Sequence, residues 1–331
     1  MNRRDVLLGA TALAACGQAA STPPAPPFPM RRGVNLGNAL EAPSEGEWGY
    51  RIEAAHLTAI ATAGFDGVRL PVRWDAHAGS TPPYAIAPNF FRRVDEVIDQ
   101  ALSAGLKVQL DMHHYGDLID QGPNSRHRAR FLGMWRNIAH HYRGLPEALY
   151  FEPLNEPHGG AWDGPALDAL QRDVVATIRE SHPRRLIVLG PGNWNSINAL
   201  RDWAPIDGEG IAVSVHYYEP HDFTHQNGEW LGAEAPNFGR PWGTEADREQ
   251  VRAHIQRAAE WANARGAPLQ LGEFGVNRAL PVEQRALWTR TVRQACDLYG
   301  IGWCVWDFAG MFPIWDGNSF IPEMRAALLG S

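Results

Sequence analysis

Residues 148–157 read ALYFEPLNEP, and residues 268–275 read PLQLGEFG. Each segment is a short apolar run that leads into a glutamate, Glu156 in the first and Glu273 in the second. A short apolar run bounded by turn residues is typical of a buried β-strand. The two segments therefore predict two strands that each deliver a carboxylate at the C-terminal end, as acid and nucleophile hydrolysis of a glycosidic bond requires.

Other apolar runs of the same character alternate along the chain with amphipathic segments. The strand candidates are residues 33–36, 67–70, 106–112, 148–151, 186–189, 211–215, 269–271 and 301–305. The helix candidates are residues 51–63, 89–104, 126–142, 165–181, 244–265 and 282–298, with shorter pieces at 196–200 and 320–329. This alternation predicts an α/β fold of the (β/α)8 TIM barrel class in a single domain.

A doubly wound open sheet is the alternative fold for the same alternation of strands and helices. It is disfavoured because no glycine-rich phosphate-binding loop follows the first predicted strand. The length of 331 residues suits one large domain, and the hydrophobic fraction of 44% is sufficient for a large core.

The charge of the chain limits the class of partner. The formal net charge is -7, and the sequence holds no basic run that would indicate nucleic acid as a partner. A neutral ligand fits this mild acidity better than an anionic one does. We therefore expect a neutral substrate and no nucleic-acid partner. We also expect a monomer.

The first residues have the features of an export signal rather than of folded structure. Residues 1–15 combine a twin-arginine-like start with an apolar stretch that is shorter than the ~20 residues of a membrane-spanning helix. Residues 13–16 read LAAC, which resembles the processing site of a bacterial lipoprotein and predicts lipidation of Cys16. An ordinary secretory signal that happens to contain Cys16 is the alternative.

The segment after this signal predicts a tether. Residues 16–30 are rich in proline and alanine, a composition typical of a flexible linker, and the catalytic domain is predicted to occupy residues 31–331. We expect an exported protein that is periplasmic, held in the outer membrane as a lipoprotein, or secreted. Its contact with a membrane would be through the lipid anchor alone.

Two further cysteines, Cys296 and Cys304, could pair in an oxidising compartment. They fall on a predicted helix and on the strand that directly follows it, a short connection that disfavours disulfide geometry. Two buried thiols are therefore the preferred interpretation.

Polar and aromatic side chains gather at the C-terminal ends of the predicted strands. They are Arg69, Asp111, His113, His114, Asn155, Glu156, His216, Tyr217, Tyr218, Glu273, Trp306 and Asp307. In a (β/α)8 barrel these strand ends meet on one face, which carries the chemistry. Each residue alone has a structural explanation, but together they predict an active site on that face.

The same segments resemble glycoside hydrolase family 5, in the clan of barrels whose catalytic glutamates follow strands four and seven. The matching segments are residues 65–72 (FDGVRLPV), 110–114 (LDMHH), 154–157 (LNEP), 215–218 (VHYY), 271–275 (LGEFG) and 303–306 (WCVW). They occur in the order of the family and cover residues from about 31 to 322. The resemblance implies a retaining endo-β-1,4-glucanase that acts on a β-linked polysaccharide or oligosaccharide and needs neither cofactor nor metal.

The resemblance also implies the roles of the residues around the scissile bond. Glu156 would be the general acid/base and Glu273 the nucleophile of a double displacement. Arg69 would lie beside Glu273 and keep it ionised, and Tyr218 would donate its hydroxyl to the same carboxylate. His216 would lie close to Glu156 and help to position it.

Further residues are expected to contact the sugar itself. The amide of Asn155 would reach a 2-hydroxyl, His113 would bind hydroxyls in the same subsite, and His114 would form the wall of that subsite. Trp306 offers a flat apolar face on which a pyranose ring can stack.

The chain has 13 tryptophans, several of them in predicted loops. Candidates for sugar platforms are Trp48, Trp162, Trp194, Trp230, Trp242 and Trp315. Trp194 is the best placed, because it follows the fifth strand; a packing role is the alternative for each of them. His221 and His225 have the spacing of metal ligands on a helix, but no helix is predicted there, and we expect no metal.

Three other functions are alternatives to a β-1,4-glucanase. The same fold and mechanism could act on mannan, xyloglucan or β-1,3-glucan, since the loops rather than the shared motifs decide the substrate. A metal-dependent barrel hydrolase would need a His-x-His pair at the end of the first strand, where this chain has Asn35, Gly37 and Asn38. A non-catalytic glycan-binding lipoprotein would be expected to lack one of the two glutamates.

Overall fold

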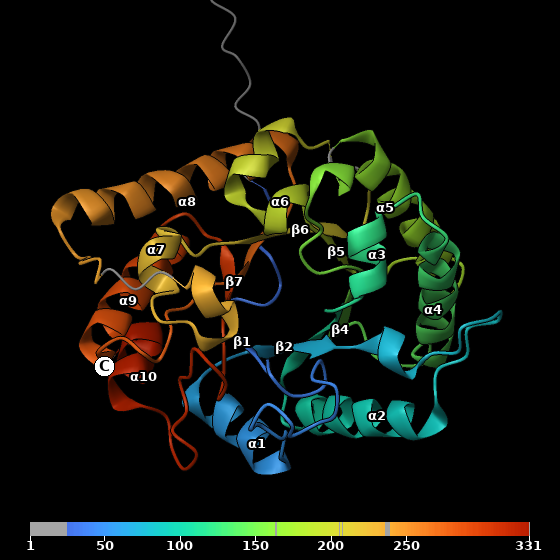
Figure 1. Ribbon diagram of the computed structural model, residues 1–331, viewed down its shortest axis with the longest axis horizontal. Coiled ribbons are helices and arrows are strands. Elements are labelled where there is room, and N and C mark those ends of the chain that lie inside the picture. The colour runs from blue at the N-terminus through green and yellow to red at the C-terminus, as the bar shows by residue number, and fades with distance from the viewer. Residues whose placement is uncertain (1–24, 163, 205, 207, 236–238, 331) are drawn as a thin grey trace, which may run out of the picture.

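The computed structural model describes residues 25–162, 164–204, 206, 208–235 and 239–330 (Figure 1). The predicted export signal and Cys16 lie outside these residues. Within the described part of the chain, no helix is both long and apolar enough to span a bilayer.

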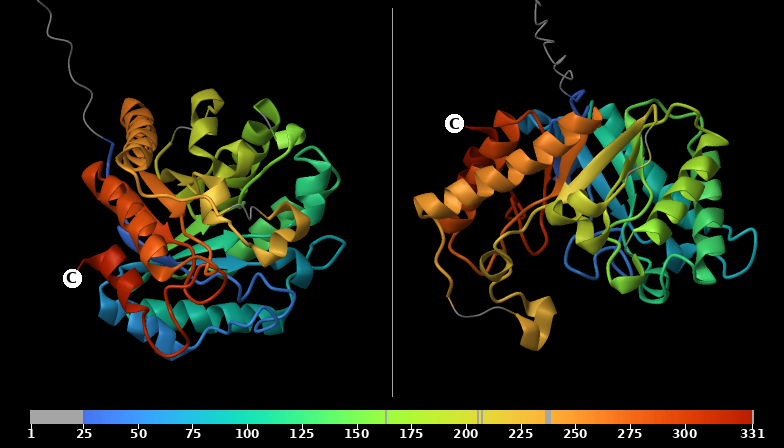
Figure 2. Two further views of the ribbon diagram at one scale, coloured as in Figure 1. Left: turned by 60° about the vertical axis from the view of Figure 1, so that its left-hand side comes forward. Right: turned by 90° about the horizontal axis from the view of Figure 1, so that it is seen from above.

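Eight parallel strands form a closed barrel in chain order, and helices surround it (Figures 1 and 2). The strands are β1 (Arg32–Asn35), β2 (Gly67–Val72), β3 (Lys107–Met112), β4 (Leu149–Glu152), β5 (Ile187–Leu189), β6 (Ile211–His216), β7 (Leu269–Glu273) and β8 (Gly302–Val305). The barrel closes because β1 pairs in parallel with both β2 and β8. The predicted (β/α)8 barrel is confirmed, and the doubly wound open sheet is excluded.

The main helices of the outer layer fall where the amphipathic segments predict them. They are α1 (Ala54–Ala63), α2 (Pro88–Ser103), α4 (His127–His141), α5 (Pro165–Arg179), α8 (Glu245–Arg265), α9 (Val282–Leu298) and α10 (Pro322–Leu329). Apolar side chains on their inner faces pack against the strands and form one continuous core.

Shorter helices lie in the connections. They are α3 (Gly116–Gln121), α6 (Gly192–Asn195), α7 (His221–Thr224), η1 (Trp74–His77), η2 (Gly160–Trp162), η3 (Ile197–Asp202) and η4 (Glu229–Glu234). The expectation that no helix forms at residue 221 is therefore wrong. The helix there, α7, is a single turn of four residues, which is too short to show a helical period in the sequence.

The N-terminal part of the domain begins earlier than the predicted boundary at residue 31. Phe28 and Met30 are fully buried and pack with Tyr150 and Cys304. A methyl group added at Gly67 would lie 2.7 Å from the Met30 side chain, so this glycine makes room for it. Residues 28–30 therefore belong to the folded domain and not to a tether.

The burial of Met30 leads to a prediction for stability. Met30→Ala should lower the free energy of unfolding by about 2–5 kcal/mol, because it leaves a cavity in a packed layer. Urea denaturation followed by circular dichroism measures this loss. An unchanged denaturation midpoint would show that Met30 lies outside the cooperative core.

Cys296 on α9 and Cys304 on β8 are both buried and both free. The interpretation as two buried thiols is confirmed.

Candidate active site

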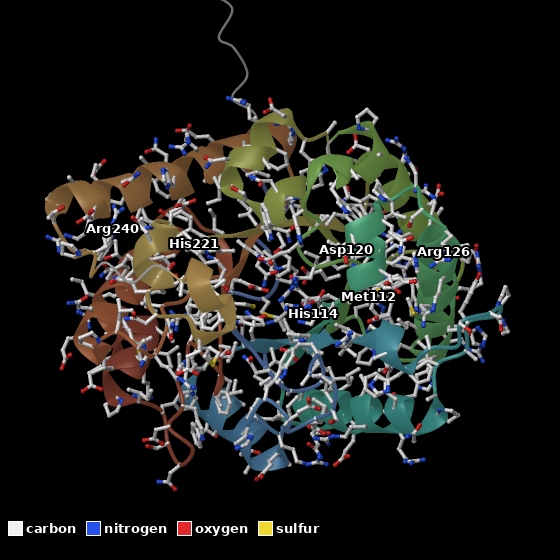
Figure 3. The ribbon with its side chains drawn as sticks, in the orientation of Figure 1. Met112, His114, Asp120, Arg126, His221 and Arg240 are labelled. Atoms are coloured by element: carbon white, nitrogen blue, oxygen red, sulfur yellow. The ribbon has the colours of Figure 1, made fainter. Side chains whose placement is uncertain are left out.

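A cleft of about 1040 Å³ opens at the C-terminal ends of the strands. The predicted site residues that line it include His113, His114, Glu156, Trp194, His216, Tyr217, Tyr218, Glu273 and Trp306. Figure 3 labels two lining residues from different connections, His114 after β3 and His221 at the start of α7. The barrel thus brings together side chains that are distant in the sequence, as the pattern of strand ends predicts.

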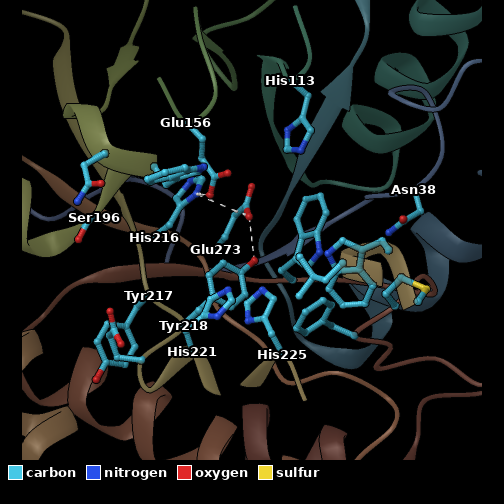
Figure 4. Close-up of a pocket in the computed structure, with 18 of the residues that line it drawn as sticks. Asn38, His113, Glu156, Ser196, His216, Tyr217, Tyr218, His221, His225 and Glu273 are labelled. Atoms are coloured by element: carbon cyan, nitrogen blue, oxygen red, sulfur yellow. Dashed lines mark hydrogen bonds and ion pairs between the residues drawn. The ribbon is translucent and has the colours of Figure 1, made fainter. Parts of the chain in front are cut away.

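Glu156 and Glu273 face each other in this cleft (Figure 4). Glu273 is the last residue of β7, and Glu156 follows β4 in the connection to α5. One carboxylate oxygen of each glutamate and one ring nitrogen of His216 all lie within 4.8 Å of one another. The two carboxylates are therefore close enough to act on one bond.

The guanidinium of Arg69 is fully buried beneath this pair and is saturated with acceptors. Its Nη1 donates to Glu273 Oε1 at 2.7 Å, and its Nε and Nη2 form a two-pronged pair with Glu152 at 2.6 and 2.9 Å. Its other partners are Asn35 at 3.0 Å, Asn155 at 2.8 Å and Asp111 at 2.9 Å. Arg69 therefore fixes Glu273 to the barrel wall by a charge-assisted hydrogen bond.

Glu152 is a residue of this network that the sequence analysis missed. It is 1% exposed, and it accepts a further hydrogen bond from Gln109 Nε2 at 2.7 Å. The signal was present, because a glutamate that directly follows a buried apolar run is itself buried only when it is paired. Its partner could not be identified from the sequence, because Arg69 lies on a different strand.

Hydrogen bonds also distinguish the two facing glutamates. Glu273 Oε2 accepts the Tyr218 hydroxyl at 2.8 Å, in addition to its bond from Arg69 (Figure 4). Glu156 Oε1 lies 2.7 Å from His216 Nδ1. Glu273 is thus held by a guanidinium and a phenol, whereas Glu156 is held by an imidazole.

His216 is positioned to be a neutral donor. Burial lowers its pKa to about 4, so the ring is uncharged at neutral pH. Asn195 Nδ2 lies 3.5 Å from His216 Nε2, which places an amide donor against that nitrogen. In the tautomer that carries the proton on Nδ1, the ring donates to Glu156 and accepts from Asn195.

Burial acts on both carboxyl groups of the facing pair. It raises the pKa of Glu156 to about 7, against the lowering effects of Arg69 and His158. It raises the pKa of Glu273 to about 7 as well, against the lowering effects of His216, Arg69 and the Tyr218 hydroxyl. Two carboxylates this close resist joint ionisation, so the site favours a state in which one of them carries a proton.

An aromatic wall lies beside the glutamates. The rings of His113 and Trp306 are parallel at 5.2 Å, and the ring of His114 meets that of His113 edge-on at 4.7 Å. His113 Nδ1 lies 2.7 Å from Asp111 Oδ2. Burial lowers the pKa of His113 well below its usual value and that of His114 to about 3, so both rings are neutral hydrogen-bonding groups.

Arg69 and Asn155 are not among the residues that line the cleft. Both are buried, and the Asn155 Oδ1 atom accepts a hydrogen bond from Arg69. The contact of the Asn155 amide with a sugar hydroxyl stays a prediction.

The six tryptophans predicted as sugar platforms divide into two groups. Trp48, Trp194 and Trp230 are 45%, 51% and 46% exposed and line the cleft. The other three, Trp162, Trp242 and Trp315, do not line the cleft. The prediction is wrong for Trp162 and Trp242, which are buried, and it stays a prediction for Trp315, which is partly exposed. Trp162 is fully buried, Trp242 stacks on Phe223 and Trp315 stacks on Phe308.

A second pair of carboxyl groups lies beside Trp306, and the sequence analysis missed one of them. Glu41, which lines the cleft, accepts backbone hydrogen bonds from Asn38 and Ala39. Asn38 Nδ2 donates to Asp307 Oδ2 at 2.5 Å, so Asn38 bridges the two acids. Burial raises the pKa of Glu41 to about 8 and that of Asp307 to about 7.

Among the described residues, one group of three side chains has the spacing to hold a metal ion: Glu156, His216 and Glu273. The Arg69 guanidinium bound to Glu273 disfavours a cation there by electrostatic repulsion. The rings of His221 and His225 stack nearly parallel at 3.9 Å, and the two residues are not part of that group. The arrangement suits proton transfer between carboxyl groups better than metal binding.

Comparisons with known proteins give a consistent result. A family model described as cellulase (glycosyl hydrolase family 5) matches residues 31–311. Endoglucanase H of Acetivibrio thermocellus is 34% identical over 91% of this chain, and the match spans 33% of that longer protein. Endoglucanase A of Ruminococcus albus is 28% identical over 88% of this chain and 86% of its own length.

Solved structures extend these comparisons. Cel5A of Thermotoga maritima, solved in complex with cellobiose, is 37% identical with a TM-score of 0.87 and covers 91% of this chain and 97% of its own. A further structure of that enzyme contains a mannotriose substrate. The cellulose synthase subunit Z of Clostridioides difficile is 32% identical with a TM-score of 0.85 and covers 91% and 99% of the two chains.

Proposed function

The chain belongs to glycosyl hydrolase family 5, and we propose that it is a retaining endo-β-1,4-glucanase. The observation that carries the proposal is the pair of glutamates in the cleft, with oxygens within 4.8 Å of each other. Retaining enzymes hold their two carboxyl groups about 5–5.5 Å apart, whereas inverting enzymes leave room for a water at about 6.5–9.5 Å. The close pair supports a double displacement.

The hydrogen bonds support a division of roles within this pair. Glu273 binds a permanent cation and a hydroxyl donor, both of which favour its charged form, so it is the ionised nucleophile. Glu156 has no guanidinium partner and takes the shared proton. The neutral His216 ring can donate Nδ1–H to Glu156 whether the Glu156 carboxyl group is protonated or ionised.

In the first step, Glu273 attacks the anomeric carbon and forms a glycosyl ester while the glycosidic C–O bond breaks. Glu156 gives its proton to the departing oxygen, so the leaving sugar is released as an alcohol. In the second step, Glu156 takes a proton from water, whose oxygen attacks the anomeric carbon and frees Glu273. Two inversions at one carbon restore its original configuration.

The aromatic wall supports a pyranose ring during these steps. The face of Trp306 can stack on the apolar face of the sugar, and the neutral His113 and His114 rings can exchange hydrogen bonds with its hydroxyls. Trp48, Trp194 and Trp230 extend this surface along the cleft.

A hydrolysis panel tests the substrate. The panel contains carboxymethylcellulose, mixed-linkage β-glucan, glucomannan, galactomannan, xyloglucan and xylan, and a reducing-end assay measures the products. The first two should be cut fastest. Mannan is the second candidate, because the Thermotoga maritima enzyme of the same family was solved with mannotriose as well as cellobiose. Fastest cleavage of galactomannan would contradict the glucanase proposal and favour a mannanase.

Removal of the Tyr218 hydroxyl should change the pH dependence in a defined direction. This hydroxyl favours the ionised form of Glu273, so Tyr218→Phe raises the pKa of the nucleophile. The acidic limb of kcat/KM should move upward by about one pH unit, since one net hydrogen bond is about 1 kcal/mol and one pKa unit is about 1.4 kcal/mol. An acidic limb that stays in place would show that Tyr218 does not act on Glu273.

We also propose that the protein is exported and anchored by a lipid on Cys16, as its N-terminal sequence predicts. In a Gram-negative host, Cys16→Ser should move the protein from the membrane fraction to the soluble fraction, as judged by immunoblotting. Retention of the variant on membranes would contradict lipidation at this residue.

A further inference from the structure

Two segments beside the active site have backbone conformations that L-residues rarely adopt. Glu156 has a φ of 44°, and Asn193, Trp194 and Asn195 have φ values of 54°, 57° and 54°. Non-glycine residues persist in this left-handed region only where their surroundings impose it, and such residues cluster at functional sites.

The two left-handed segments contact each other directly. The Trp194 backbone N–H donates to the Pro157 carbonyl at 3.3 Å. The Trp194 indole stacks on the His158 ring with centroids 4.6 Å apart and planes 8° from parallel. His158 Nδ1–H in turn donates to the Glu156 carbonyl oxygen at 2.7 Å. A continuous path therefore runs from the face of Trp194 to the backbone of Glu156.

A second path joins the same turn to the side chain of Glu156. Asn195 is fully buried, and its Nδ2 lies against His216 Nε2 at 3.5 Å. His216 Nδ1 contacts Glu156 Oε1 at 2.7 Å (Figure 4). The turn at residues 193–195 therefore contacts both histidines that hold Glu156. His158 binds the backbone carbonyl of Glu156, and His216 binds its carboxyl group.

The turn also presents an open face to the cleft. Trp194 is 51% exposed and lines the cleft, while the next residue, Asn195, is fully buried. An indole that is half exposed in the cleft and held by its backbone and by the His158 ring is a suitable platform for a sugar ring. In the proposed mechanism Glu156 protonates the departing oxygen, and Trp194 contacts the segment that carries Glu156, so a sugar stacked on Trp194 would lie on the leaving-group side.

We propose that His158 is a positioning residue that couples a sugar stacked on Trp194, on the leaving-group side, to the orientation of the Glu156 carboxyl group. This inference rests on the proposed role of Glu156 as acid/base. A bound sugar holds the indole, the indole holds the His158 ring, and the ring holds the Glu156 carbonyl in its left-handed conformation. Proton donation is then most effective when a leaving-group sugar is present.

Two substitutions separate the two contacts of His158. His158→Asn keeps an N–H donor near the position of Nδ1 and loses the ring that stacks on Trp194. His158→Phe keeps a ring for stacking and loses the donor to the Glu156 carbonyl. Thermal unfolding of both variants establishes that the barrel is intact.

Aryl β-cellobiosides test the positioning of the acid. Phenyl β-cellobioside has a poor leaving group that needs a proton, whereas 2,4-dinitrophenyl β-cellobioside does not. His158→Phe should lower kcat/KM on the phenyl substrate by about 10- to 100-fold, the scale of a small misplacement of a catalytic group, and far less on the dinitrophenyl substrate. His158→Asn should keep most of the wild-type kcat/KM on the phenyl substrate, because it keeps the donor to the Glu156 carbonyl. Equal losses on the two substrates would overturn the positioning role.

Cellopentaose tests the coupling to Trp194. Trp194→Ala should lower kcat/KM on cellopentaose more than on β-cellobiosyl fluoride, whose leaving group has no ring to stack. In the His158→Asn background, Trp194→Ala should lower kcat/KM on cellopentaose by a smaller factor, because the stack between Trp194 and His158 is already absent. Additive losses would overturn the coupling, and this cycle decides the question even if His158→Phe does not fold. A wild-type enzyme that leaves cellopentaose intact would instead contradict the proposed function.

Discussion

Glu273→Ala is expected to lower kcat on cello-oligosaccharides by at least about 10⁵-fold, because it removes the atom that forms the glycosyl ester. The loss should exceed that of any other single substitution in the cleft. Arg69 and Tyr218 would remain, but they would bind no carboxylate. Turnover of carboxymethylcellulose and of 2,4-dinitrophenyl β-cellobioside measures the effect.

Azide makes this prediction specific to a missing nucleophile. The space left by the side chain admits a small anion, which can attack the anomeric carbon of the activated aryl glycoside from the vacated face. The product should be the α-glycosyl azide, since one displacement inverts the centre once. Glu273→Gln fills the space and should not respond to azide. Glu323 is an exposed carboxylate at the start of α10, and its removal is the control. Glu323→Ala should keep wild-type turnover.

The outcome that contradicts the assignment is equally definite. Near-normal hydrolysis of cellulosic and mannan substrates by Glu273→Ala would exclude Glu273 as the nucleophile. A β-glycosyl azide from this variant would indicate that the other glutamate had formed the ester.

Glu156→Gln is expected to have the second largest effect, and the effect should depend on the substrate. Loss of the proton donor should lower turnover of cello-oligosaccharides by about 10²- to 10⁴-fold. Formation of the glycosyl ester from 2,4-dinitrophenyl β-cellobioside should continue, because dinitrophenolate leaves without a proton. The second step should become slow, since no base remains to activate water.

Azide should also distinguish Glu156 from the nucleophile, because the product expected from Glu156→Gln has the opposite anomeric configuration to that from Glu273→Ala. In Glu156→Gln it can attack the accumulated glycosyl ester without a general base, which gives the β-glycosyl azide. The alkaline limb of kcat/KM should also disappear, because in the wild type activity is lost as pH rises through the pKa of Glu156, which burial raises to about 7. Retention of that limb in the variant would assign it to a different group.

The sequence was sufficient to predict the barrel and the face of the barrel on which the cleft opens. Short apolar runs mark the strands, and a polar residue such as Glu273 at the end of a run marks the face on which the cleft opens. These features are local in the sequence, and the closure of the barrel then brings the strand ends together.

Contacts between strands could not be predicted in the same way. The pairing of Arg69 with Glu152, Asp111 and Asn155 depends on which side chains point inward at the same level of the barrel. The burial of Glu41 depends on how the connection after β1 folds against Asp307. Neither arrangement leaves a periodic signal in the sequence.

Loops were the other limit of the sequence analysis. Trp194 and Trp162 both fall in predicted connections, yet one is half exposed in the cleft and the other donates its indole N–H to the Ile119 carbonyl inside the protein. The difference arises from packing between loops that are distant in sequence. Phe28 and Met30 illustrate the same limit, because a proline-rich composition conceals two residues that complete the core.

The central claim is that Glu273 forms a covalent bond with the sugar during a retaining reaction. Incubation with 2,4-dinitrophenyl 2-deoxy-2-fluoro-β-cellobioside, followed by proteolysis and mass spectrometry of the peptides, tests it most directly. The fluorine slows both steps, and the good leaving group lets the first step proceed, so the intermediate should accumulate. The account predicts one fluorocellobiosyl group per molecule, attached to Glu273. A label on Glu156, or turnover of this substrate with no labelled peptide, would contradict it.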